Sequence, residues 1–374
     1  MSSKEQVTAL LTLADIQIGD TRPWDIQVHN EKFYDRVMAD ANLGAGEAYM
    51  DEWWDCQKLD QFFERLILAK IQDKINPAKF IPHIIKGKIL NMQTKHLSKQ
   101  VAQEHYDVGN TLYSKMLGKH MQYTCGYYEK TKKLDDAQLA KLDLVAKKLM
   151  LKPGMKILEL GSGFGGLAYH LAKKYKCEVT SYNISKEQVA YGREWCKGLP
   201  VTFMETDYRD AIKLSAKSFD RVVSVGLLEH IGHKNYRSFL ELAFTMMKDD
   251  GIFVLHSIGG NKSKWSTDPW IDKYIFPHGH LPSITQLGDA IDNLWVVEDW
   301  QNFGPDYDNT LMAWHANIEK SWKDLPQYDE RFRRMWRYYL LSCAGGFRAR
   351  GMQLWQLVLT KPGRPGSYRR PVLK

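Results

Sequence analysis

A glycine-rich turn between an apolar strand and a helix contains the residues best suited to bind a small ligand. The run 156–160 is apolar apart from its first residue and Glu159, as expected for a parallel strand covered on both faces. Gly161, Gly163 and Gly165 follow at alternate positions. Glycine adopts left-handed backbone conformations and lets a ligand approach the main chain closely. The segment therefore predicts a nucleotide-binding turn.

Two classes of nucleotide ligand fit this turn. Gly161, Gly163 and Gly166 match the G-x-G-x-x-G spacing of dinucleotide-binding folds. Glu159, followed by Gly161, Gly163 and Gly165, is similar to the acidic-x-Gly-x-Gly-x-Gly pattern of class I methyltransferases. In those proteins the turn holds the amino-acid part of S-adenosylmethionine (SAM). SAM has no pyrophosphate, so the helix N-terminus is needed less for anion binding than in a NAD site.

The ends of the next two strands help to separate these ligands. The second strand, 177–182, ends at Asn183, where NAD enzymes and many methyltransferases carry an acid. Asn183 can still hydrogen-bond a ribose hydroxyl. The third strand, 201–205, is followed by Asp207, at a position where methyltransferases commonly have an acid that meets the adenine amino group. The turn and Asp207 together favour SAM over NAD.

Length and charge limit the classes of protein. At 374 residues the chain is long enough for more than one domain, and its formal net charge of +8 favours an acidic partner. Nucleic acid and anionic lipid both qualify. The sequence contains no arginine-rich tract, RNA-module motif or zinc-finger spacing, so nucleic acid has only the charge in its favour and no metal site is predicted.

Cysteine usage and hydropathy favour a cytoplasmic chain. The cysteines are odd in number and form no Cys-x-x-Cys pair, as expected for a reduced protein. They are Cys56, Cys125, Cys177, Cys196 and Cys343. The start of the chain does not resemble a secretory signal, and no segment approaches a continuous membrane span. Any membrane contact is therefore expected to be peripheral.

Residues 1–75 are expected to form a smaller N-terminal α+β domain. A helix is predicted over 7–13, short strands over 16–18 and 26–28, and an amphipathic helix over 60–71 with Asp60 as its N-cap.

The segment 76–104 interleaves lysines with apolar residues. Such a segment is either a connecting helix with a solvated face or a docking surface for anionic headgroups. The aromatic-rich stretch 259–286 lies where a substrate pocket is expected, and Trp270, Tyr274 and Phe276 are either acyl-tunnel or core residues.

Several further motifs along the chain resemble one family. They are the segments 44–51 (GAGEAYMD), 123–127 (YTCGY), 226–232 (GLLEHIG), 255–259 (LHSIG), 303–308 (FGPDYD) and 343–350 (CAGGFRAR). The whole chain resembles bacterial cyclopropane-fatty-acyl-phospholipid synthases, and residues 105–374 also resemble mycolic acid cyclopropane synthases. The resemblance implies an α/β, Rossmann-like class I SAM-dependent methyltransferase domain over 105–374, with a seven-stranded, mostly parallel sheet. It also implies that 1–75 serves lipid binding or dimerisation, joined by a basic linker.

The resemblance implies a reaction at a cis double bond. The family transfers a methylene, derived from the SAM methyl group, to unsaturated phospholipid acyl chains. The lipid passes through a carbocation, which a bound bicarbonate deprotonates. A site for this reaction must exclude water. If the cation is quenched differently, a methyl-branched or methylene product results, and this alternative stays open.

Site residues follow from the same resemblance. The implied bicarbonate site comprises Cys125, Glu229, His256, the backbone of Ile258, and Tyr307, and Cys343 lies near the pocket or in the core. The implied SAM contacts are Tyr123, Thr124, Glu159, Gly161, Gly163, Gly165, Asn183, Gln188, Asp207 and Tyr208. Taken singly, a buried cysteine, a core histidine or a packed tyrosine is an equally ordinary structural residue.

The resemblance further implies a homodimer associated peripherally with the inner face of an anionic membrane. Two other functions remain to be separated from this one. A basic nucleic-acid methyltransferase would label nucleic acid, although the fourth strand is followed by Leu227-Leu-Glu-His230 and not by the Asn/Asp-Pro-Pro-Tyr motif of base methylation. A non-catalytic lipid-binding protein would bind vesicles and consume no SAM.

Overall fold

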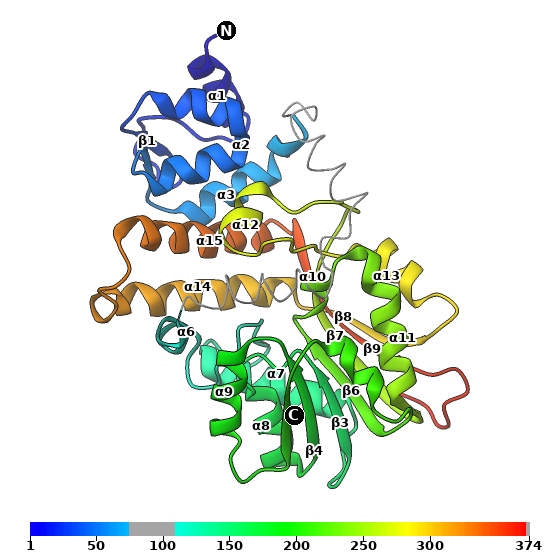
Figure 1. Cartoon of the computed structure of the whole chain (residues 1–374). Coiled ribbons are helices and arrows are strands. Elements are labelled where there is room, and N and C mark those ends of the chain that lie inside the picture. Colours follow the sequence, from blue (N-terminus) through cyan, green and yellow to red (C-terminus); the bar gives the residue numbers. More distant parts are fainter. Residues whose placement is uncertain (75–108, 372–374) are drawn as a thin grey trace. The chain divides into compact units, whose positions relative to one another are not determined.

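The computed structural model describes residues 1–74 and 109–371, which divide into two compact units (Figure 1). The first, here called the helical unit, comprises the described residues 1–74, 265–278 and 307–352. The second, here called the sheet unit, comprises 109–264, 279–306 and 353–371.

The sheet unit alternates strands with helices. Its elements are α6 (Asn110–Leu117), α7 (Leu134–Lys148), β3 (Lys156–Leu160), α8 (Gly166–Tyr175), β4 (Glu178–Asn183), α9 (Lys186–Trp195), β5 (Val201–Glu205), η3 (Tyr208–Lys213), β6 (Phe219–Val225), α10 (Leu228–Ile231), η4 (His233–Asn235), α11 (Tyr236–Met246), β7 (Met247–Gly260), α13 (Ile284–Ile291), β8 (Val296–Asn302) and β9 (Met352–Thr360). The strands that the sequence predicts over 156–160, 177–182 and 201–205 correspond to β3, β4 and β5, and each differs by one residue at most.

These strands form one sheet, which has seven strands among the described residues and the order β5-β4-β3-β6-β7-β9-β8. The pairs within β5-β4-β3-β6-β7 are parallel, whereas β8 and β9 are antiparallel. Because parallel strands need crossover connections, helices cover both faces of such a sheet. The carboxyl ends of β3, β4, β6 and β7 consequently lie along one edge, which is where a doubly wound fold binds its ligand.

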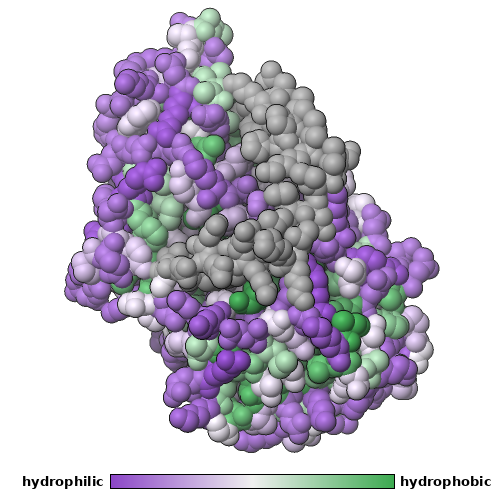
Figure 2. Space-filling view, viewed as in Figure 1, coloured by the Kyte–Doolittle hydropathy of each residue, from purple (hydrophilic) through white to green (hydrophobic). Residues whose placement is uncertain are grey.

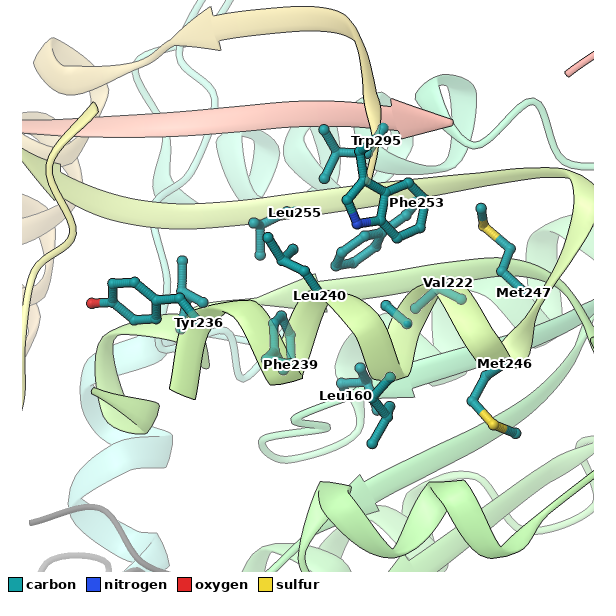
Figure 3. Packing of buried hydrophobic residues seen from close by; sticks show 14 of the residues in the cluster. Leu160, Val222, Tyr236, Phe239, Leu240, Met246, Met247, Phe253, Leu255 and Trp295 are labelled. Atoms are coloured by element: carbon teal, nitrogen blue, oxygen red, sulfur yellow. The ribbon is translucent and has the colours of Figure 1, made fainter. Parts of the chain in front are cut away.

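Each face of the sheet has its own apolar core. On one face, α11 and α13 pack against the strands, and Figure 3 shows Phe239 and Leu240 of α11 beside Phe253, Leu255 and Trp295. On the other face, residues of α7, α8 and α9 pack against β3, β4 and β7. Burial on both faces explains why β3 reads as a nearly continuous apolar run.

The helical unit is built from segments that are distant in sequence. Its elements are α1 (Ser3–Thr12), β1 (Ile26–Val28), α2 (Lys32–Met50), β2 (Trp54–Cys56), α3 (Leu59–Leu68), η1 (Ile71–Asp73), α12 (Pro269–Tyr274), most of α14 (Gly304–Ser321), η5 (Trp322–Asp324) and α15 (Glu330–Arg348). The two short strands pair antiparallel.

Close packing and a partly buried ion pair hold α15 against α3. A Cβ added at Gly345 would lie 2.8 Å from the backbone nitrogen of Glu64, so only glycine permits this approach. Three residues later on α15, the Arg348 guanidinium bonds the carboxylates of Asp60 and Asp308. These contacts place 307–352 with the N-terminal segments, although Arg348 and Asp60 lie 288 residues apart in the sequence.

Three local predictions for this unit need correction. Asp60 is not the N-cap of α3, since Lys58 occupies that position and the Asp60 carboxylate is buried against Arg348. The strand predicted over 16–18 is reduced to a single bridge between Ile18 and Ile26, because β1 pairs with β2 instead. The predicted helix over 60–71 ends at Leu68.

The division into units also differs from the continuous domains predicted over 1–75 and 105–374, since 265–278 and 307–352 group with the N-terminal part. Trp270 explains part of this grouping: its indole packs on Gly46 of α2 and its ring centroid lies 4.5 Å from that of Tyr338. Trp270 is therefore a core residue of the helical unit. The predicted basic linker, 76–104, lies outside the described residues.

The visible surface is mostly hydrophilic, with hydrophobic residues in separate patches (Figure 2). Large exposed hydrophobic side chains include Leu68, Ile212 and Ile284. Within residues 1–74 and 109–371, no helix has the length and apolar character required to cross a bilayer.

The packing of α15 on α3 gives a test of the fold. We expect Gly345→Ala to lower the free energy of unfolding by about 1–3 kcal/mol, because the added methyl group overpacks the contact with α3. Gly288→Ala is the matched control: Gly288 is exposed on α13 with no atom near the added Cβ, and helix propensity predicts a gain of about 1 kcal/mol. Urea unfolding of both variants measures the difference, and equal stability would contradict the packing argument.

Candidate active site

The turn after β3 has the backbone conformation that its glycines predict. The φ angles of Gly161, Gly163 and Gly165 are +90°, +50° and +86°, and residues that carry a side chain rarely adopt such values. Two of these positions are also crowded: a Cβ at Gly161 would lie 3.1 Å from Leu227, and one at Gly165 would lie 2.9 Å from the Phe203 ring. No atom lies within 4 Å of a Cβ built at Gly163, so that side of the turn is open among the described residues.

The predicted cofactor residues Asn183 and Gln188 lie against this turn. The Asn183 amide nitrogen donates to the backbone oxygen of Gly163 at 3.0 Å and to the Gln188 side-chain oxygen at 2.9 Å. The Asn183 side-chain oxygen accepts from the backbone nitrogen of Ser185 at 3.0 Å. The amide therefore joins the end of β4 to the glycine turn and to the start of α9. This is the position at which many methyltransferases have an acid.

Glu159 supports the site from inside the sheet. Its side chain is buried on β3, and the hydroxyl of Ser181, its register partner on β4, donates a hydrogen bond to the carboxyl. Burial raises the pKa of Glu159 to about 7, an effect that this hydrogen bond and the positive charge of Lys141 oppose. The hydrogen bond links β3 to β4 directly beside the turn.

The predicted adenine contacts, Asp207 and Tyr208, follow β5 in the structure. Both oxygens of the buried Asp207 carboxylate accept hydrogen bonds from Arg209, one from its backbone nitrogen at 2.9 Å and one from its guanidinium at 3.0 Å. The Tyr208 ring packs in the core beside Phe239. A ligand at this position would share Asp207 with Arg209.

The segment containing Tyr123, Thr124 and Cys125 reaches the ends of two strands. The Thr124 methyl carbon lies 2.8 Å from a Cβ built at Gly226, the residue that follows β6. The Tyr123 ring contacts Tyr113, which in turn contacts Phe164 of the glycine turn. Cys125 is fully buried, and its thiol donates to the backbone oxygen of Gly126 at 3.1 Å. The predicted SAM contacts Tyr123 and Thr124 therefore lie between the ends of β3 and β6.

Glu229 is a buried carboxyl with one oxygen bonded and one without a partner. It lies on α10, directly after β6, and its Oε1 accepts from the backbone nitrogen of Ile258 at 2.6 Å. Its Oε2 is buried and has no hydrogen-bond partner among the described residues. Burial raises the pKa of Glu229 to about 7 despite the hydrogen bond from Ile258. The carboxyl therefore changes between its neutral and charged forms near neutral pH.

His256 on β7 likewise has one ring nitrogen that is hydrogen-bonded and one that is buried without a partner among the described residues. The side-chain nitrogen of Gln356 on β9 lies 3.1 Å from Nδ1. An amide donor makes Nδ1 the acceptor and puts the ring proton on Nε2. Nε2 is buried without a partner among the described residues. Burial holds the pKa of His256 well below its ordinary value, and the positive charges of Lys141 and Lys148 lower it further, so the ring is neutral.

Glu229 and His256 have different hydrogen-bond partners. Glu229 bonds the backbone of Ile258, and Gln356 bonds the histidine. The backbone nitrogen of Ile258 is therefore already bonded to Glu229. A neutral imidazole N–H and a carboxyl that titrates near neutrality are a pair able to hold a small polar anion.

Tyr307 and Cys343 belong to the helical unit. Tyr307 is on α14, where its ring lies 4.6 Å from that of Phe347, centroid to centroid, and Cys343 is half-buried on α15. Their predicted roles at the site stay predictions.

The structure adds three residues that the sequence analysis did not single out. Gln356 bonds His256, while Gln138 and Lys141 of α7 bond the segment containing Thr124. All three side chains are buried. Polar residues set among the apolar residues of 134–148 and 352–360 were the available signal, because such residues are seldom buried unless they are bonded.

Comparison with known proteins places the chain in a family. A sequence profile described as mycolic acid cyclopropane synthetase matches residues 93–357. The chain belongs to this family. Cyclopropane-fatty-acyl-phospholipid synthase of Escherichia coli K12 is 45% identical over 354 residues, which cover 94% of this chain and 92% of that protein. A probable fatty acid methyltransferase of Pseudomonas putida is 32% identical over 314 residues, covering 81% of this chain and 79% of that protein.

A solved member of the mycolic acid cyclopropane synthetase family has the same fold. The structure of mycolic acid cyclopropane synthase CmaA1 complexed with SAH and CTAB superposes with a TM-score of 0.63 at 28% identity, covering 70% of this chain and 98% of that one. The predicted class I SAM-dependent methyltransferase fold and the resemblance to cyclopropane-fatty-acyl-phospholipid synthases are thereby confirmed.

The raised pKa of Glu229 predicts a pH-dependent stability difference. Folding raises this pKa from 4.5 to about 7, so the folded chain binds a proton more tightly than the unfolded chain. The stabilisation is fully present below the unfolded pKa and is lost as the pH rises through the folded pKa. Relative to Glu229→Gln, which keeps the oxygen that accepts from Ile258, the wild type should lose about 3 kcal/mol between about pH 4 and about pH 8.

Urea unfolding of wild type and Glu229→Gln across this pH range measures the difference. Contributions from Glu159 and the other titrating groups are common to both proteins and cancel. Parallel stability profiles would show that the Glu229 pKa is not raised.

Proposed function

We propose that this protein is a SAM-dependent enzyme that forms cyclopropane rings at cis double bonds of unsaturated phospholipid acyl chains. The observation that carries the proposal is the pairing of a methyltransferase glycine turn with two buried, partly unpartnered groups at the ends of neighbouring strands, Glu229 and His256. Membership of the mycolic acid cyclopropane synthetase family and 45% identity to the Escherichia coli phospholipid enzyme support it.

The residues of the glycine turn bind and orient SAM in this proposal. The open side of Gly163 admits the amino-acid part, and Asn183 and Asp207 supply hydrogen-bonding groups for the ribose and the adenine. Binding fixes the sulfonium methyl group at the carboxyl ends of the strands. The alkene is a weak nucleophile, so positioning and exclusion of water are the main contributions that the chain makes to methyl transfer.

Glu229 and His256 fit the anion that the reaction is proposed to use. A bound bicarbonate would supply the base that takes a proton from the lipid cation and allows the ring to close. His256 Nε2 can donate a hydrogen bond to such an anion, and neutral Glu229 can do the same through Oε2. Both groups are buried, so these hydrogen bonds form without competition from water. Neutral partners also avoid the repulsion that an ionised Glu229 would exert on the anion.

The protein is further proposed to act at a membrane surface as a peripheral, cytoplasmic enzyme and as a homodimer. Its net charge of +8 favours an anionic lipid surface. The chief alternative keeps methyl transfer and ends in a methyl-branched or methylene product. The similarity to a probable fatty acid methyltransferase of Pseudomonas putida supports this second function.

Label transfer to lipid vesicles tests the proposal. Purified protein is incubated with methyl-labelled SAM and vesicles of phosphatidylglycerol with cis-monounsaturated chains. We expect label in the lipid and proton NMR signals of ring methylene groups upfield of the ordinary acyl signals. Vesicles with fully saturated chains are the control and should take up no label. An added methyl group in place of the ring signals would support the alternative product, and unlabelled lipid would refute both.

Removal of bicarbonate tests the role proposed for the anion. Under rigorous depletion of carbon dioxide, we expect turnover to fall by at least about tenfold, because a positioned base typically contributes a factor of this size or more. Affinity for SAM, measured by calorimetry in the same buffers, should not change. Restoring bicarbonate should restore the rate. A depleted enzyme that keeps its full rate would assign proton removal to a side chain of the protein.

A further inference from the structure

We propose that Lys141 and Gln138 are positioning residues that hold the segment 122–125 against the ends of β3 and β6 in the conformation that binds SAM. This inference rests on the proposed function, because it concerns the binding of the same co-substrate. Neither residue is assigned a contact with SAM. They act through Gln122 and Thr124, which they hold by hydrogen bonds.

The contacts form a clamp on one side of the segment. The Lys141 ammonium nitrogen donates to the Gln122 side-chain oxygen at 2.5 Å and to the Thr124 hydroxyl at 2.9 Å. One turn earlier on α7, the Gln138 amide nitrogen donates to the backbone oxygen of Thr124 at 2.7 Å. The two residues therefore bind the backbone and the side chain of Thr124 together.

The segment needs such a clamp because it lacks its own secondary structure. Residues 122–128 belong to neither a helix nor a strand. Buried backbone groups outside regular structure must find other partners, and here the partner of the Thr124 carbonyl is a side chain of α7. On the opposite side, the Thr124 methyl group packs on Gly226 and Tyr123 is linked through Tyr113 to the glycine turn. The position of the segment is thus determined from both sides.

The burial of Lys141 argues that it has a specific role. Its side chain is 2% exposed, and burial lowers its pKa to about 7, an effect that the nearby Glu159 carboxyl partly offsets. Burying an amine costs free energy that an apolar residue of similar length would not cost. An amine that loses its proton near neutral pH still donates hydrogen bonds, and it does not repel the positive sulfonium of SAM. An apolar side chain could fill the space and could not hold Gln122 and Thr124.

Lys148 supplies a matched control on the same helix. It is also buried, and its pKa is also lowered by burial, to about 8. Its ammonium nitrogen lies 3.4 Å from Asp299 and 5.3 Å from the centroid of the Phe303 ring, so these partners lie outside 122–125. Replacing either lysine by methionine removes a buried amine while keeping most of the side-chain volume. The two variants therefore share any general effect on packing and differ in the clamp.

Calorimetric titration of the full chain with SAM, together with steady-state kinetics, tests the inference. We expect Lys141→Met to raise the Kd for SAM by about tenfold or more, which corresponds to the loss of one or two hydrogen bonds. Gln138→Met removes no charge and loses the hydrogen bond to the Thr124 carbonyl. It should raise the Kd for SAM by about threefold to tenfold. Lys148→Met should bind SAM like the wild type. At saturating SAM, Gln138→Met should approach the wild-type kcat, because it removes no charge near His256 and its defect lies in KM.

Three results would overturn the inference. Wild-type affinity for SAM in both clamp variants would show that the segment keeps its conformation without them. An equal loss of SAM affinity in Lys148→Met would show that the loss in the clamp variants comes from a general effect on packing. A fall in kcat with unchanged Kd would place the residues in the chemical step. If the wild type itself bound no SAM, the proposed function would fail and this inference with it, whereas the first three results leave the proposed function intact.

Discussion

The site depends on keeping polar side chains away from water at the carboxyl ends of β6 and β7. Desolvation disfavours the charged form of every group there. It raises the pKa of Glu229 and lowers that of His256, so the two groups move toward neutrality from opposite directions. In water the same pair would be a carboxylate and a partly protonated imidazole. Buried, the imidazole is neutral and the carboxyl keeps its proton up to about neutral pH, which is the form of the pair that suits the proposed anion.

The fold excludes water from this edge of the sheet because helices cover both faces and the ends of the strands pack closely. The turn after β3 lies against Leu227 at the end of β6, and Thr124 lies against Gly226. A side chain at Gly259, three residues beyond His256, would overlap the ring of Trp355 on β9. Glycines at these positions let the backbone of one strand end approach the side chains of the next. The same closeness leaves little room for water between β3, β6 and β7.

The parts of the structure that the sequence predicted are those that local residues determine. The apolar runs gave the strands β3 to β5 within one residue, and the acidic-x-Gly-x-Gly-x-Gly spacing predicted the left-handed turn. The parts that it missed depend on residues far apart in the chain. Gln356 meets His256 from a strand 100 positions away, and Asp60 is bonded by Arg348 and so does not cap α3. Gln138 and Lys141 alternate with apolar residues on α7, a pattern that is also typical of a solvated helix face.

The contact between Gln356 and His256 has a consequence for where a proton can reside. A carboxamide has a donor at one end and an acceptor at the other. Rotating that group by half a turn would exchange the two ends facing the imidazole and would move the ring hydrogen from one nitrogen to the other. Nε2 would change from giving a hydrogen to offering a lone pair, and no charge would be introduced. An uncharged amide can thus reverse the polarity of its neighbouring histidine, which an aspartate at the same position could not do.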